Sequence, residues 1–148
     1  MQVTVFRDLF NATDVPYIVP IDKIIRRVEE GSSKENIEKV RLSKSEKEKN
    51  RLKKKLPAIL FSGIFSQRNK DGCTEHSGLM ITDFDKFPSK DEYSRMWNLL
   101  KKNEHIFFMF RSPSGNGIKA VVRIPQADKF DHERYFKSFR DNFKYDYF

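Results

Sequence analysis

Two aspartates separated by one residue stand at the end of an apolar run, Leu79 to Phe84. Because alternate side chains of a strand point to opposite faces, Asp83 and Asp85 are expected on the same side of the strand end. Two carboxylates held close together repel each other unless a cation lies between them, and Mg²⁺ or Mn²⁺ prefers such oxygen ligands. The pair therefore predicts a divalent-metal site, although aspartate is also common where a strand enters a turn.

The loop of small residues over 112–117 is the second element that could carry chemistry. It is followed by a cation, Lys119. Such a loop offers backbone N–H groups to a phosphate, while glycine in a hairpin loop also has the ordinary explanation that turns need positive φ. The residues predicted to hold the phosphates of a nucleotide are Ser112, Ser114, Gly115, Asn116, Gly117 and Lys119. Metal carboxylates combined with a phosphate loop indicate phosphoryl or nucleotidyl transfer, so the predicted catalytic residues are Asp83, Asp85 and Lys119.

The elements that position these groups follow from the apolar periodicity after Gly78, which switches between two and 3.6 residues. A strand is predicted over 79–84, a helix over 89–103 with a capping box at Ser89 and Glu92, a hairpin of strands over 106–110 and 118–124, and a final helix from about 131. This order predicts an α+β fold, a ferredoxin-like or RNA-recognition-motif β-α-β-β-α half with one open sheet face and its closing strand missing.

The first 57 residues are predicted to form an N-terminal α/β extension, and residues 58–148 a core truncated at its C-terminus. The extension is expected to contain a strand over 2–6, a helix over 21–30 and a basic helical segment over 33–55. The core is expected to begin with a strand over 58–62, followed by a long loop over 63–77. A charge run is often a solvated helix face, but cations also contact nucleic-acid backbones. The cations predicted to make such contacts are Lys53, Lys54, Lys55, Arg111 and Arg123.

Composition limits the classes of partner and compartment. The 148 residues include 29 Lys and Arg against 21 Asp and Glu, so the net charge of +8 suits a phosphate-rich partner or an anionic membrane surface. No apolar run is long enough to span a bilayer and no signal peptide is present, so we expect a soluble cytoplasmic protein without a membrane partner. The single cysteine, Cys73, excludes an intrachain disulfide, and its Cys-x-x-His spacing to His76 lacks a second pair of zinc ligands.

Two segments resemble the archaeo-eukaryotic primase (primase–polymerase) superfamily, and more narrowly the VirE N-terminal domain family. They are Gly78-Leu79-Met80-Ile81-Thr82-Asp83-Phe84-Asp85 and Ser112-Pro113-Ser114-Gly115-Asn116-Gly117-Ile118-Lys119. Further similarity at Leu56-Pro57-Ala58, Phe61-Ser62-Gly63 and His76-Ser77-Gly78 extends the resemblance over roughly the last two thirds of the chain.

The resemblance implies the N-terminal domain of a bacterial or mobile-element replication protein that catalyses metal-dependent nucleotidyl transfer. Asp83 and Asp85 would hold Mg²⁺ or Mn²⁺, and Lys119 would contact the phosphates of a nucleoside triphosphate. The template would be single-stranded or primed nucleic acid, and a C-terminal helicase-type domain or another replication protein would be a partner. Two departures from the family pattern are that many members carry histidine in place of Lys119, and that a third acid is expected on a later strand, where only Asp146 is available.

Two other classes of function remain open from the residues alone. A non-catalytic module for single-stranded nucleic acid would stack bases on aromatic residues of the open sheet face, such as Phe107. A structural or protein-interaction domain would use its acidic pair only to end a strand. Only this last class predicts no metal dependence at all, whereas the binding module predicts salt-sensitive affinity that is unaffected or improved by changing Asp83 and Asp85.

Overall fold

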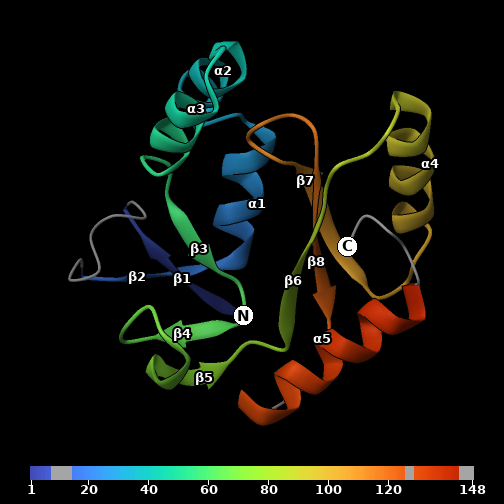
Figure 1. The fold of residues 1–148 in the computed structure, drawn as a ribbon. Helices are drawn as coiled ribbons and strands as arrows, with labels where there is room; N and C mark the ends of the chain where they lie inside the picture. The colour runs from blue at the N-terminus through green and yellow to red at the C-terminus, as the bar shows by residue number, and fades with distance from the viewer. Residues whose placement is uncertain (8–14, 126–128, 144–148) are drawn as a thin grey trace. The chain divides into compact units, whose positions relative to one another are not determined.

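The computed structural model describes residues 1–7, 15–125 and 129–143, and the chain forms two compact units, Met1–Ser77 and Gly78–Phe148 (Figure 1). Both units combine helices with antiparallel strands, which confirms the predicted α+β class. No helix in the described part of the chain is both long enough and apolar enough to cross a membrane.

The first unit contains a three-stranded antiparallel sheet, three helices and a hairpin. The sheet has the strand order β2-β1-β3. Its elements are β1 (Gln2–Phe6), β2 (Tyr17–Pro20), α1 (Ile21–Glu29), α2 (Lys34–Leu42), α3 (Glu46–Lys53), β3 (Ala58–Leu60), β4 (Gly63–Phe65), the 3₁₀ helix η1 (Lys70–Gly72) and β5 (Cys73–His76). Strand β3, which the sequence grouped with the following core, pairs with β1 and therefore belongs to the first unit.

The segment 63–77, predicted to be a loop, instead contains the antiparallel pair β4 and β5. Gly63 has a φ of 153°, and a Cβ atom at this position would lie 1.9 Å from the carbonyl oxygen of Glu75, so only glycine allows the two strands to approach. The buried hydroxyl of Thr4 donates to the carbonyl of Gly63 and accepts from the N–H of Phe65, both at 2.9 Å. These contacts connect the hairpin to β1.

The second unit follows the predicted order of strand, helix, strand, strand, helix. Its elements are β6 (Leu79–Phe84), α4 (Lys90–Lys101), β7 (Ile106–Arg111), β8 (Ile118–Arg123) and α5 (Lys129–Phe143). The sheet order is β6-β8-β7, with both neighbouring pairs antiparallel. Strand β8 therefore lies in the centre, as a split β-α-β arrangement requires.

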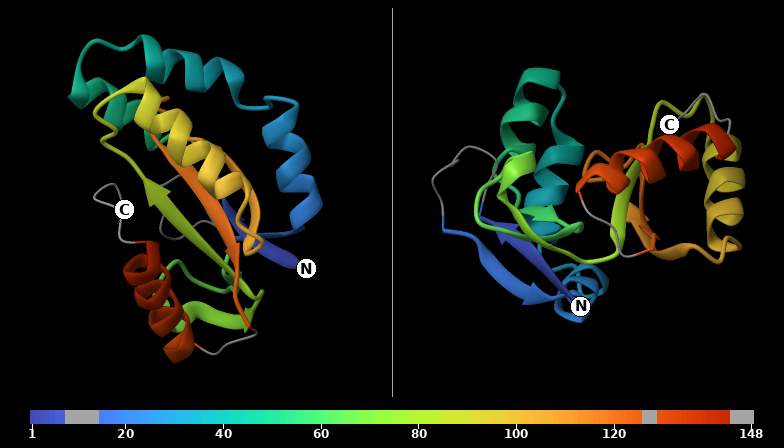
Figure 2. Two further views of the ribbon diagram at one scale, coloured as in Figure 1. Left: turned by 90° about the vertical axis from the view of Figure 1, so that its right-hand side faces the viewer. Right: turned by 90° about the horizontal axis from the view of Figure 1, so that it is seen from below.

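Both helices of the second unit cover the same face of its sheet (Figures 1 and 2). Met96 and Leu100 of α4 are buried against Phe84 and Ile118, and Phe139 of α5 packs against the same cluster. The helix α4 begins at Ser89, whose side chain accepts a hydrogen bond from the N–H of Glu92, as the capping box predicts. Packing of the two helices on the sheet thus fixes the ends of β6 and β8, where Asp83, Asp85 and Lys119 lie.

Candidate functional site

The acidic strand and the basic strand bring Asp83 and Lys119 directly opposite each other. These residues are partners in the antiparallel register of β6 and β8, and opposite residues of such a pair share one face of the sheet. The Lys119 Nζ atom donates to the Asp83 Oδ1 atom at 2.5 Å. We call this side of the sheet, which also carries Arg123, the charged face.

Asp85 lies just beyond the end of β6 and is exposed. It lies beside the loop that joins β7 to β8, because a Cβ atom at Gly117 would be 3.4 Å from the Asp85 Cβ atom. The same added atom would be 2.9 Å from the carbonyl oxygen of Phe84, closer than real Cβ atoms come to backbone. The absence of a side chain at Gly117 therefore lets the loop approach the acidic strand end.

The loop at 112–117 is held by its own hydrogen bonds. The N–H groups of Gly115 and Gly117 donate to the backbone oxygen and side-chain oxygen of Ser112, at 2.9 and 3.0 Å, and the hydroxyl groups of Ser112 and Ser114 lie 3.1 Å apart. Within the described residues no hydrogen bond engages the N–H of Ser114 or Asn116. These two N–H groups, rather than those of the glycines, are the ones that a phosphate could meet.

Lys86 is a residue of the site region that the sequence did not single out. Its φ of 59° makes it the one non-glycine residue with positive φ in the described part of the chain, and it directly follows Asp85. Such a conformation costs a residue with a side chain about 1–2 kcal/mol and is concentrated at functional sites. The chain thus bends sharply at the acidic strand end, a feature for which the sequence carries no glycine or asparagine signal.

The two arginines predicted to contact nucleic acid lie on opposite faces of the sheet. Arg123 lies two residues beyond Val121 on the charged face, and its guanidinium carbon is 4.6 Å from the centre of the Phe107 ring. Arg111 instead pairs in register with Ile118, whose side chain belongs to the core beneath α4 and α5. Arg111 therefore points to the helix side and is not brought together with Asp83.

Aromatic rings of β7 accompany the cations of the charged face. Phe110 pairs in register with Lys119, and Phe108 pairs with Val121, so both rings are on this face. The two rings are stacked, with centroids 5.6 Å apart and an interplanar angle of 15°. This face therefore carries partly buried, stacked rings, and Val121 is completely buried on it between Phe108 and Ile81, its partners in register.

The oxygen donors available to a divalent metal are those of the two aspartates. Asp83 and Asp85 supply hard carboxylate oxygens, which suit Mg²⁺ or Mn²⁺. Among the described residues no three His, Cys, Asp or Glu side chains come together, and Asp146, the only late acid available as a third ligand, lies outside those residues. The donor set in the described residues is therefore two carboxylates, of which that of Asp83 is paired with the Lys119 ammonium.

The remaining predicted residues belong to the first unit. Lys53 is the last residue of α3 and Lys54 is its C-cap. The helix dipole stabilises cations at a helix C-terminus, so these lysines also have a structural explanation that involves no nucleic acid. Lys54 and Lys55 are exposed and Lys53 is half-buried.

Cys73 and His76 are three positions apart in β5. This spacing turns their side chains to opposite faces of the strand, so the two residues do not form a shared zinc site.

Comparison with known proteins identifies one family. The family model described as BT4734-like, N-terminal domain, matches residues 51–145, which is more than half of the chain and includes the acidic strand end, the loop at 112–117 and Lys119. No curated protein and no solved structure matches the chain. On the extent of this match, the chain belongs to the BT4734-like, N-terminal domain family.

Proposed function

We propose that the second unit binds a nucleoside triphosphate together with Mg²⁺ or Mn²⁺ and catalyses nucleotidyl transfer on a nucleic-acid template. The observation that supports this most strongly is the register that pairs Asp83 with Lys119, next to Asp85 and the glycine loop. At one strand end, the carboxylates would bind the positive metal ion and the cation would bind the negative phosphates of a metal-bound triphosphate. This function is the one that the resemblance to the primase–polymerase superfamily implies.

In this proposal the carboxylates of Asp83 and Asp85 hold the metal, and Lys119 changes partner. A divalent ion, when bound, would neutralise the triphosphate and stabilise charge on the attacking and leaving oxygens. The Asp83 carboxylate, which is paired with the Lys119 ammonium, would take the metal as its counter-charge, and Lys119 would then be available to the phosphates. The N–H groups of Ser114 and Asn116 donate to the same phosphates.

The template would be single-stranded or primed nucleic acid. Arg123 and Lys119 lie on the charged face with the Phe107 and Phe110 rings, so this face offers phosphate contacts and stacking surfaces together. The cations at 53–55 would add contacts from the first unit. A helicase-type domain or another replication protein would be a partner, and the protein would act in the cytoplasm.

A second candidate function is a non-catalytic module for single-stranded nucleic acid. It is favoured by the Arg123 guanidinium over the Phe107 ring and by the stacked Phe108 and Phe110 rings, which need no metal. In such a module the acidic pair would repel phosphates. Removing Asp83 and Asp85 would then leave binding unchanged or strengthen it.

The test is a calorimetric titration of Mn²⁺ with a nucleoside triphosphate. The full chain is compared with an Asp83→Asn, Asp85→Asn double variant, and with Asp91→Asn as a control that removes an exposed carboxylate from the first turn of α4. We expect metal-dependent nucleotide binding in the full chain and the control, and its loss in the double variant. Equal binding of metal and nucleotide by all three proteins would reject the carboxylate site and leave the non-catalytic module as the better candidate.

A further inference from the structure

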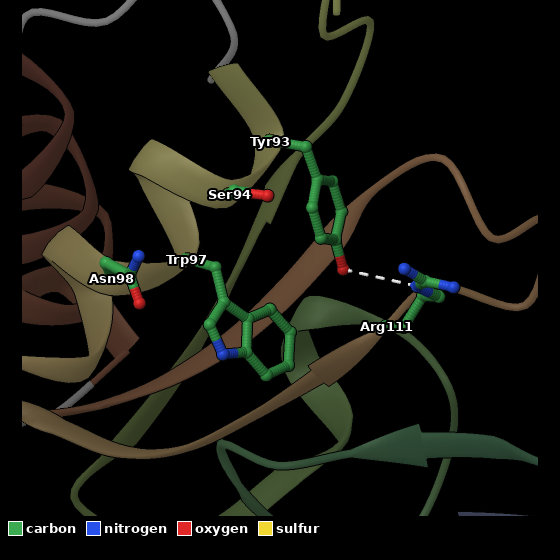
Figure 3. A pocket seen from close by; sticks show the side chains of 5 residues that line it. All are labelled: Tyr93, Ser94, Trp97, Asn98 and Arg111. Carbon is green, nitrogen blue, oxygen red and sulfur yellow. Dashed lines mark hydrogen bonds between the residues drawn. The ribbon is translucent and has the colours of Figure 1, made fainter. Parts of the chain in front are cut away.

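A pocket separate from the carboxylates lies between helix α4 and the end of β7 (Figure 3). Its volume is about 330 Å³, within the range of small-ligand sites. It is lined by Tyr93, Ser94, Trp97, Asn98 and Arg111. Because Arg111 is on the helix side of the sheet and Lys119 is on the charged face, the pocket and the proposed metal site are on opposite sides.

The rings of the pocket are held in place by the core and by each other. Tyr93 and Trp97 are four residues apart on α4, with ring centroids 6.1 Å apart and an interplanar angle of 20°. Both pack against the core cluster that contains Met96 and Leu100. Trp97 is nonetheless only half-buried, so part of its indole remains accessible to a ligand.

Arg111 completes the pocket from the strand. Its guanidinium carbon is 5.3 Å from the centre of the Tyr93 ring, and its Nε donates to the Tyr93 hydroxyl at 3.4 Å (Figure 3). The Arg111 side chain is exposed, and ring stacking restricts its orientation while leaving donors for an anion. The next residue, Ser112, begins the loop of the proposed triphosphate site.

The chemistry of the lining selects a class of ligand. The single charged side chain of the pocket is a cation, which disfavours cationic ligands and favours an anion. Trp97 offers a flat apolar surface to a planar ring, and the Asn98 amide and Ser94 hydroxyl offer hydrogen bonds to the edge of that ring. A planar heteroaromatic ring that carries a phosphate satisfies all three requirements.

We propose that this pocket binds one unpaired nucleotide, with the base against Trp97 and the phosphate on Arg111. Base stacking on an aromatic side chain contributes about 1–3 kcal/mol and accepts any base, so the pocket selects single strands without selecting a sequence. The binding does not require nucleotidyl transfer or a metal. The nucleotide belongs either to a single strand or to a free mononucleotide, which have the same recognition chemistry.

Trp97 is the only tryptophan of the chain, so its fluorescence reports directly on the pocket. The experiment titrates a short oligothymidylate, and separately thymidine monophosphate, into the full chain without metal. We expect saturable quenching of Trp97, and an Arg111→Ala variant should weaken the binding about ten-fold because a charge-assisted hydrogen bond is lost. Saturation by the mononucleotide alone would identify a free nucleotide as the ligand, and saturation by only the oligonucleotide would identify a strand.

Controls separate pocket binding from general attraction to a basic protein. Lys101→Ala removes one exposed cation from the same helix and should leave the affinity unchanged, whereas Asn98→Ala should weaken binding and Arg111→Lys should weaken it less than Arg111→Ala. The Asp83→Asn, Asp85→Asn variant should bind the oligonucleotide as the full chain does, so failure of the metal site would not be mistaken for failure of the pocket. Unchanged Trp97 fluorescence, or equal effects of Arg111→Ala and Lys101→Ala, would overturn the proposal.

Discussion

Among single residues, Lys119 gives the most direct test of how phosphates would be bound. We expect Lys119→Ala to weaken metal-dependent triphosphate binding about ten-fold, because one charge-assisted hydrogen bond is lost. The side chain of Lys119 is 29% exposed and that of Asp83 is 59% exposed, so their ion pair contributes at most about 1 kcal/mol to stability. Calorimetry measures the affinity, and urea unfolding measures the stability.

The matched variant for this prediction is Lys119→Arg, which keeps the positive charge and should retain most of the affinity. If Lys119→Ala binds the triphosphate as tightly as the unchanged chain, the phosphates are held elsewhere. A loss of folding in Lys119→Ala, seen as a large drop in the urea midpoint, would instead assign the residue a structural role.

The sequence predicted part of this residue-level arrangement. Strand alternation predicts Asp83 and Asp85 on the same side of the strand end, but the pairing of Asp83 with Lys119 depends on the register of β6 against β8, which spacing along the chain does not determine. Likewise, Tyr93 and Trp97 are four residues apart, a spacing that puts them on the same side of a helix. Periodicity shows which side of a helix is apolar, but not that both rings lie at the edge of the core beside an arginine.

At the scale of elements, the cap of α4 predicts a measurable contribution to stability. The Ser89 Oγ atom accepts from the N–H of Glu92 at 3.1 Å, so Ser89→Ala should lower the free energy of unfolding by about 1 kcal/mol. Ser33 precedes α2 without any side-chain capping bond, and Ser33→Ala should therefore have a smaller effect. Urea unfolding followed by circular dichroism measures both, and equal effects would contradict the assigned cap.

The β4 and β5 hairpin gives the second prediction at this scale. A Cβ atom at Gly63 would lie 1.9 Å from the Glu75 carbonyl oxygen, so Gly63→Ala should destabilise the chain by more than about 2 kcal/mol. At Gly31, with φ of 68°, the nearest atom to an added Cβ is the Lys34 Cβ at 3.6 Å, so Gly31→Ala should cost only about 1 kcal/mol. Similar urea midpoints for the two variants would contradict this difference.

The same hairpin shows where element prediction from the sequence fails. Its strands have three and four residues, and the exposed Thr74 and Glu75 give β5 no apolar alternation. The two strands approach each other through their backbones at Gly63, and such pairing leaves no periodic pattern of apolar residues in the sequence. In contrast, α4, β7 and β8 were predicted nearly to the residue, because each combines a marked apolar pattern with a cap or turn signal.

At the scale of the whole molecule, the net charge of +8 predicts oligonucleotide binding that weakens with salt. If Arg111, Lys119 and Arg123 each contact one phosphate, the logarithm of the binding constant should fall against the logarithm of salt concentration with a slope of about −2. Arg111→Ala should reduce the magnitude of this slope by about 0.7. Fluorescence anisotropy of a labelled oligonucleotide at several salt concentrations measures the slope, and an identical slope for the variant would exclude a phosphate contact by Arg111.

The two units differ in one further respect, since the first contains the only cysteine, Cys73, and the second contains the only tryptophan, Trp97. The unchanged chain is therefore a ready donor and acceptor pair for resonance energy transfer, once an acceptor dye is attached to the thiol. Burial raises the pKa of the Cys73 thiol, so fewer molecules carry the reactive thiolate at neutral pH and labelling proceeds faster in alkaline buffer. Any ligand that changes the distance between the units would then change the transfer efficiency without a single substitution in the chain.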